Sequence, residues 1–222
     1  EMARGVCSGA QDNNGTQQVG YISTNIEFVG SLLPNSFSDP NDYGNPDIAA
    51  VSSRIDGRGE GRAFFIAPTA SVTFTHVAFV NGDAATDTSN GNIGGGIYAD
   101  SGSTVVLNES PICQNTAEDG GGIYGDTGSN VTLNGAQSGA CRVFLYMKVQ
   151  PGGVLVPVYA TFAGNEASSD GGGAYLAGTF LINNYGLEIN TAVNNGGGVY
   201  ATGNGEMINT VFLLNEAGGD GA

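Results

Sequence analysis

Aspartate recurs at one place in the sequence, directly before runs of glycine. Asp119, Asp170 and Asp220 each precede such a run, and Asn195 stands at the equivalent place of an intervening segment. Stacked carboxylates repel one another unless they are solvated or bridged by a hard cation with oxygen ligands. Calcium is therefore the one candidate cofactor and this column its candidate metal site. Solvated turn residues are the alternative.

A second polar column alternates acid and hydroxyl. It consists of Glu166, Thr191 and Glu216, which are spaced 25 residues apart. Solvation or a bridging cation would explain this column in the same way.

Tyrosine also recurs in register with the glycines. Each tyrosine follows an apolar residue, and strand side chains alternate between the two faces of a sheet. If the apolar residues point into a core, the tyrosines form an exposed ladder, which could stack on sugars or another molecule or simply stabilise the sheet. The candidate binding residues are Tyr98, Tyr124, Tyr175 and Tyr200.

Residues suited to catalysis are few. Hydrolysis of a glycosidic bond needs flanking carboxylates, and elimination needs a basic residue to take a proton. The chain has one lysine, Lys148, and one histidine, His76. Arg54, Arg58 and Arg62 alternate with acids in SRIDGRGEGR, where local pairing is the simplest interpretation. We therefore predict no catalytic residue.

The three cysteines lack CxxC spacing, which argues against zinc and redox motifs. Cys113 and Cys141 are 28 residues apart, close to one repeat, so neighbouring rungs could bring them within disulfide reach. Such a bridge would indicate an oxidising compartment.

The elements that position these residues follow a repeat. FAGNEASSDGGGAY begins at residue 162, LEINTAVNNGGGVY at 187 and FLLNEAGGDGA at 212, each 25 residues after the last. Two columns of structural residues result: Asn165, Asn190 and Asn215, and Gly171, Gly196 and Gly221. Upstream, the equivalent asparagine lies two periods earlier, at 115, so the intervening unit has either diverged or carries an insertion.

Short β-branched runs alternate with turns in each repeat, and no helical periodicity is present. Twenty-five extended residues reach about 80 Å, enough for one circuit of a flattened coil. We therefore predict an all-β parallel β-helix with coils about 4.8 Å apart. Glycine would allow positive φ at a recurring corner, and asparagine would tolerate the left-handed conformation and bond to the next coil.

The Phe-x-x-Asn tetrapeptides FAGN and FLLN, paired with Gly-Gly-x-apolar phrases, resemble the repeats of chlamydial polymorphic membrane proteins. Residues 55–134 resemble bacterial surface proteins with right-handed β-helix repeats. The resemblance implies a right-handed, pectin lyase-like parallel β-helix and a secreted or surface-displayed, adhesin-like role.

The chain divides into two regions. Residues 1–50 lack the repeat and are predicted to form an N-terminal cap over exposed strand edges. Residues 51–222 form the predicted β-helix, which stops within a glycine phrase, so we expect the repeat to continue. The apolar segment 141–161 is expected to supply a coil with a local excursion.

The 21 acidic residues outnumber the 6 basic ones, which argues against nucleic acid and anionic membranes as partners. No apolar run of about 18 residues is present, so no direct membrane insertion is expected. We expect an extracellular or cell-surface structural or adhesin-like protein whose partners are other protein subunits or cell-surface glycans. The alternative is a polysaccharide-active lyase or hydrolase with its site near residues 135–160.

Overall fold

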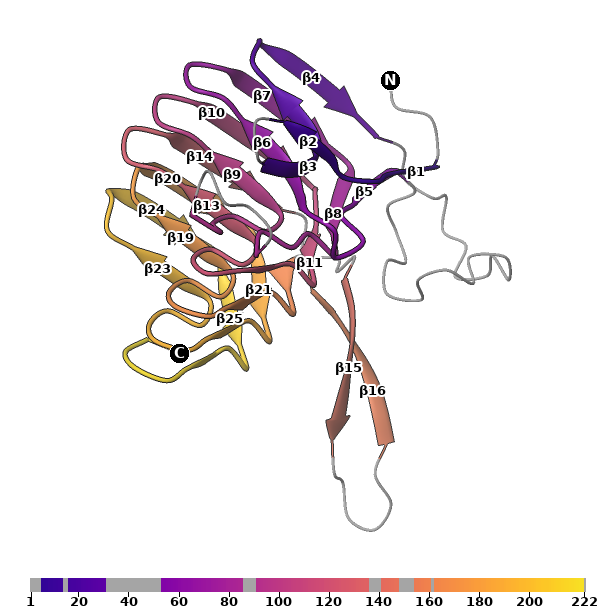
Figure 1. Cartoon of the computed structure of the whole chain (residues 1–222). Helices are drawn as coiled ribbons and strands as arrows, with labels where there is room; N and C mark the ends of the chain where they lie inside the picture. The colour runs from indigo at the N-terminus through magenta and orange to yellow at the C-terminus, as the bar shows by residue number, and fades with distance from the viewer. Residues whose placement is uncertain are drawn as a thin grey trace.

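The computed structural model describes residues 5–13, 16–30, 53–85, 91–135, 141–147, 154–160 and 162–221. All helical or extended structure within these ranges is β-strand, which confirms the all-β class. The strands form several parallel sheets, and the chain returns to each sheet in turn, so that each new strand is added beside the previous one (Figure 1).

Four sheets make up this stack. Sheet A contains β1 (Gly5–Ser8), β5 (Ser53–Asp56), β8 (Val77–Val80), β11 (Ile112–Cys113), β17 (Phe162–Ala163), β21 (Gly186–Glu188) and β25 (Val211–Leu213). Sheet B contains β2 (Gln11–Asn13), β3 (Thr16–Ile22), β6 (Arg62–Ile66), β9 (Ile97–Ala99), β13 (Ile123–Gly125), β19 (Ala174–Leu176) and β23 (Val199–Ala201).

Sheet C contains β4 (Ile26–Val29), β7 (Ser71–Thr75), β10 (Thr104–Asn108), β14 (Asn130–Asn134), β20 (Thr179–Asn183) and β24 (Gly205–Ile208). Sheet D contains β12 (Thr116–Ala117), β18 (Glu166–Ala167), β22 (Thr191–Ala192) and β26 (Glu216–Ala217). A separate antiparallel hairpin consists of β15 (Cys141–Met147) and β16 (Val154–Ala160).

The register places equivalent residues of the repeat beside one another. In sheet A, Phe162 pairs with Leu187, which in turn pairs with Phe212. The step between paired strands is longer earlier in the chain, where Phe79 pairs with Ile112. Longer loops between strands account for the difference, while the sheets themselves keep their register.

The stretch before residue 162 contains an insertion. Ile112 pairs directly with Phe162, so the 50 residues from Asn115 to Asn165 make a single step of the stack. The hairpin β15–β16 lies within this step and projects away from the stack (Figure 1). The expectation that residues 141–161 supply a coil is therefore wrong, because these strands pair with each other in antiparallel fashion.

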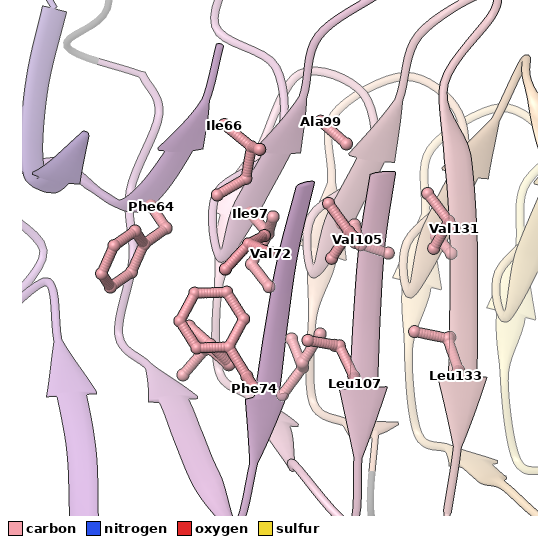
Figure 2. Close-up of a cluster of buried hydrophobic side chains, with 14 of the residues drawn as sticks. Phe64, Ile66, Val72, Phe74, Ile97, Ala99, Val105, Leu107, Val131 and Leu133 are labelled. Atoms are coloured by element: carbon pink, nitrogen blue, oxygen red, sulfur yellow. The ribbon is translucent and has the colours of Figure 1, made fainter. Parts of the chain in front are cut away.

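Apolar side chains from sheets A, B and C fill the interior. In sheet C, Val72, Val105 and Val131 lie in paired register and are buried (Figure 2). Phe74 and Leu107 form part of a second buried column. Each fully buried side chain of this size contributes about 1.5–3 kcal/mol relative to exposure, so the recurring columns supply the main stabilisation.

The first glycine of each phrase occupies a left-handed corner. The φ angles of Gly171, Gly196 and Gly221 are +69°, +64° and +77°. A Cβ atom at Gly196 would also lie 2.5 Å from the carbonyl oxygen of Val199. Conformation and space therefore both favour glycine at this corner.

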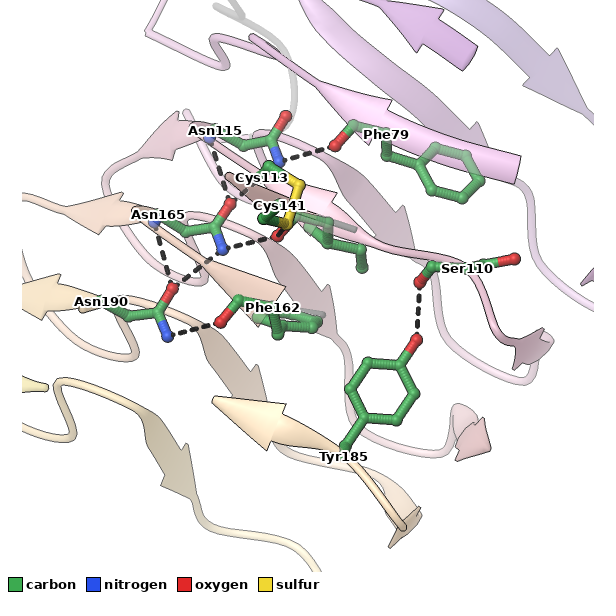
Figure 3. The surroundings of a disulfide bond; sticks show 10 residues. Phe79, Ser110, Cys113, Asn115, Cys141, Phe162, Asn165, Tyr185 and Asn190 are labelled. Carbon is green, nitrogen blue, oxygen red and sulfur yellow. Dashed lines mark hydrogen bonds between the residues drawn. A yellow bond between two sulfur atoms is a disulfide. The ribbon is translucent and has the colours of Figure 1, made fainter. Parts of the chain in front are cut away.

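The asparagine column is a buried ladder (Figure 3). Asn165 Nδ2 donates to Asn190 Oδ1, and Asn190 Nδ2 donates to Asn215 Oδ1, both at 2.9 Å. Positive φ belongs instead to the preceding residues, including Ile189 (+57°) and Leu214 (+55°). The expectation that the ladder asparagines themselves take the left-handed conformation is therefore wrong; their side chains serve hydrogen bonding.

The N-terminal region contributes strands to the stack. Strands β1, β3 and β4 pair in parallel with β5, β6 and β7. The predicted cap boundary at residue 50 lies outside the described residues. These strands extend three of the sheets at their N-terminal edge.

Candidate binding face

One aromatic residue from each of six successive strands lines up on the outer side of sheet B. The register pairs each residue with the next in the order Tyr21, Phe65, Tyr98, Tyr124, Tyr175 and Tyr200. We call this column the aromatic ladder. The inward neighbours Ile97, Ile123 and Ala174 are buried, as strand alternation requires.

Sequence reasoning found four members of the ladder and missed Tyr21 and Phe65. Neither belongs to a glycine phrase, so the repeat gave no signal for them. They are aligned by the pairing of β3 with β6 and of β6 with β9. An aromatic residue at the penultimate position of β6, in RAFFI, was the available hint.

Contacts between neighbouring rings run through the whole ladder. The centroids of Tyr124 and Tyr175 are 4.8 Å apart with an interplanar angle of 13°, so these rings are stacked face to face. Tyr98 meets Tyr124 edge-on at 5.6 Å, and Tyr175 meets Tyr200 at 5.2 Å with a tilt of 50°. Such pairs add about 0.5–1.5 kcal/mol beyond area burial.

The ladder is covered near its middle and open toward its C-terminal side. Tyr98 is 6% exposed and packs in a cluster with Phe65, against Ile93. The expected exposure of Tyr98 is therefore wrong, because the loop carrying Ile93 covers the ring. Tyr124, Tyr175 and Tyr200 are half-buried, and we call these three residues the tyrosine strip.

A buried guanidinium supports the covered part of the ladder. Arg62 lies 5.2 Å from the Tyr98 ring centroid and 5.8 Å from that of Phe65. Its Nε donates to the carbonyl oxygen of Gly94 at 2.9 Å. The expected role of Arg62, local pairing within its turn, therefore omits its main contacts, which fix the covering loop onto the ladder.

Carboxylates flank the ladder. The Tyr98 hydroxyl lies 3.4 Å from Asp100 Oδ1 and 3.5 Å from Asp126 Oδ2. Burial, followed by the charge of Asp126, raises the pKa of Tyr124 to about 12. Burial also raises the pKa of Tyr175, and Asp119 adds to the increase. The strip therefore presents neutral phenols beside negative charge, a surface suited to cationic or hydrogen-bonding partners.

The acidic column serves as a set of hydrogen-bond acceptors. Asp119 Oδ1 accepts from the backbone N–H of Asp170 at 2.9 Å. Asp170 Oδ1 accepts from both the backbone and the side chain of Asn195 at 2.9 Å, and Asn195 Oδ1 accepts from the N–H of Asp220 at 3.0 Å. Within the described residues, no group of three His, Cys, Asp or Glu side chains is arranged to hold a metal ion.

The second polar column lines a groove along sheet D. Thr116, Glu166, Thr191 and Glu216 occupy successive paired positions, and the groove has a volume of about 430 Å³. The two glutamates are two strands apart, about 9.6 Å at the usual strand spacing. Val193, 63% exposed, lies on the rim.

Cys113 and Cys141 form a disulfide with a Cα–Cα distance of 5.9 Å (Figure 3). The expected reason, neighbouring rungs, is wrong, because Cys141 opens the hairpin instead of lying on the rung after Cys113. The bond ties the base of the hairpin to sheet A. The thiol of Cys7 is free and exposed in the part of the chain that the structure describes.

The sparse catalytic candidates lie at corners. His76 Nε2 is 3.2 Å from Glu109 Oε2, and both residues have positive φ. Asp56 Oδ1 accepts from the N–H of Arg58 within its turn. Lys148 lies outside the described residues. The segment proposed for an enzyme site, 135–160, contains the hairpin.

Comparison of the chain with protein-family profiles, curated proteins and solved structures found no significant match. Within the described ranges, no helix is long and apolar enough to cross a membrane.

Proposed function

We propose that the chain is a right-handed parallel β-helix that acts outside the cell as a structural or adhesin-like element. The single observation that carries the role is the aromatic ladder with its open tyrosine strip. The 25-residue steps between strands β17, β21 and β25 and the resemblance of the repeats support the coil size and handedness. The disulfide supports an oxidising, extracellular location.

The strip favours partners that offer cations or hydrogen-bond donors. The faces of Tyr124 and Tyr175 are turned toward each other, so a sugar ring cannot stack between them. Phenol hydroxyls and nearby carboxylates are left to make the contacts. Protein subunits with basic surfaces fit this chemistry, as do cell-surface glycans that donate hydroxyl or amino hydrogens.

Binding to immobilised neutral and amino-sugar oligosaccharides, together with electron microscopy of the purified chain, tests the proposal. Tyr175→Ser should reduce binding or assembly at least tenfold, whereas Val193→Ser, on the rim of the groove, should leave both unchanged. Equal behaviour of the two variants, or the absence of both binding and assembly, would refute the role of the strip.

The groove along sheet D supports a second candidate, action on a linear polysaccharide. Two carboxylates about 9.6 Å apart are close to the separation of about 6.5–9.5 Å found in inverting glycosidases. Release of reducing ends from polysaccharides, lost in Glu166→Gln, would favour this enzyme. Unchanged polysaccharide with wild-type protein would exclude it for the substrates tried.

A further inference from the structure

The hairpin β15–β16 differs from the rest of the chain in architecture. Its two strands form a sheet of their own, and the hairpin projects from the stack (Figure 1). An isolated two-stranded hairpin is marginally stable in water and needs packing against another surface. We call residues 142–159 the arm.

The register shows that both faces of the arm are rich in apolar residues. Val143, Leu145 and Met147 share one face, and their cross-strand partners on it are Val158, Val156 and Val154. The opposite face carries Phe144 and Tyr146 with their partners Pro157 and Leu155. Near-continuous apolar strands are typical of a sheet covered on both faces.

The arm is also the basic part of an acidic chain. It holds two of the six basic residues, Arg142 and Lys148, and none of the 21 acidic residues. The tyrosine strip has the complementary character, because its aromatic rings lie beside Asp119, Asp126 and Asp170. Apolar and cationic groups on one surface thus match aromatic and anionic groups on another.

The strip of the same copy is not the surface that this arm covers. The disulfide holds the base of the arm beside sheet A, whereas the strip lies on sheet B. In the observed arrangement the arm points away from the stack (Figure 1). A seven-residue strand spans only about 23 Å.

A lipid bilayer fits the arm less well. Membrane-spanning strands need about 9–11 residues, whereas β15 and β16 each have 7. Lipid-exposed sheets also occur only as closed structures without open edges. The acidic body would in addition be repelled by anionic lipids.

We infer that the arm of one copy docks on the tyrosine strip of a second copy of this chain. This inference rests on the proposed role of the strip and names its partner. Pro157 removes one backbone donor from β16, which disfavours further strand pairing at its edge and favours docking through the faces. Because the two surfaces differ, the contact is head-to-tail and builds rings or filaments.

Two variants separate the two halves of the contact. In the first, an Asn-Gly turn replaces residues 142–159 and joins Cys141 to Ala160, which are paired in register, so the disulfide is retained. In the second, Tyr175→Ser and Tyr200→Ser remove most of the open strip. Thermal melting and thiol counting establish that each variant is folded and disulfide-bonded.

Sedimentation velocity then measures self-association. Wild-type protein should form concentration-dependent oligomers that weaken as salt is raised, and each variant alone should be monomeric. An equimolar mixture of the variants should form a heterodimer and nothing larger, because one intact arm meets one intact strip. A monomeric wild type, or a mixture without the heterodimer, overturns the inference.

Two further readouts separate this result from its alternatives. Co-flotation of wild-type protein with vesicles of neutral and anionic phospholipids, lost in the arm-deleted variant, would assign the arm to a bilayer and overturn docking between copies. The arm-deleted variant keeps the strip, so its oligosaccharide binding tests the proposed function independently of the arm.

Discussion

The backbone N–H and the side-chain Nδ2 of Asn165 both donate to Oδ1 of Asn190, at 3.1 and 2.9 Å. Asn190 repeats both bonds to Asn215, and each Nδ2 also donates to a carbonyl of a neighbouring strand in sheet A. The side chains therefore connect strands over the distance at which the sheets themselves pair. The stack is held by a polar spine as well as by its apolar core.

Asn190→Ala should lower the free energy of unfolding by about 3 kcal/mol, because each buried group left unsatisfied costs about 1–3 kcal/mol. The substitution leaves the donors of Asn165 and the carbonyl of Phe162 without this partner. Denaturant unfolding measures the change. Asn194→Ala, at an exposed position, is the control and should stay within about 0.5 kcal/mol of wild type. Equal effects would refute the spine.

The glycine corner can be separated into conformation and space. Gly59 has φ +67° with no atom within 4 Å of the position that a Cβ would take, whereas Gly196 has φ +64° and a close carbonyl. Gly59→Ala should cost about 1–2 kcal/mol, the penalty for a left-handed alanine. Gly196→Ala should cost clearly more in the same denaturant titration. If the two costs are equal, close packing at the corner contributes nothing.

The sequence repeat predicted strand content and the glycine and asparagine columns because stacked strands reuse the same residue at each step. It could not tell whether the segment before residue 162 was a diverged unit or an insertion, since the apolar run VLVPVYA suits either a coil or a hairpin. Loops of unequal length likewise hid Phe65 and Tyr21 from the ladder. Ile189 at φ +57° could not be foreseen, because β-branched residues disfavour that conformation.

Alkaline pH should destabilise the protein through the ladder. Burial raises the pKa of Tyr124 to about 12, above the value of about 10 for a free tyrosine. The folded state thus holds this proton more tightly, so its stabilising effect is complete below pH 10 and is lost as pH rises from about 10 to 12. Thermal melts across this window should show a steep fall in stability.

Tyr124→Phe tests the source of that fall, since phenylalanine keeps the ring and removes the titrating hydroxyl. The variant should lose less stability than wild type between pH 10 and 12. An identical pH profile would show that Tyr124 is not among the groups responsible.

The disulfide should contribute about 2–4 kcal/mol by constraining the unfolded chain. Alkylation of the denatured, unreduced protein should label one thiol, Cys7, and reduction should expose Cys113 and Cys141 as well. Cys113→Ala with Cys141→Ala should unfold at lower denaturant concentration, whereas Cys7→Ser should match wild type. Three reactive thiols without reduction would contradict the bond.

The aspartate column separates hydrogen bonding from calcium binding. Asp170 Oδ1 accepts two bonds from Asn195, and Asn195 Oδ1 accepts the equivalent backbone bond from Asp220. An amide oxygen can therefore replace the carboxylate, so in excess chelator Asp170→Asn should melt with wild type while Asp170→Ala melts earlier. If calcium also binds this column, adding it should raise the melting temperature of wild type and not of Asp170→Asn. A chelator-insensitive wild type would remove calcium, and an Asn variant as unstable as the Ala variant would show that the charge, not the acceptor, is required.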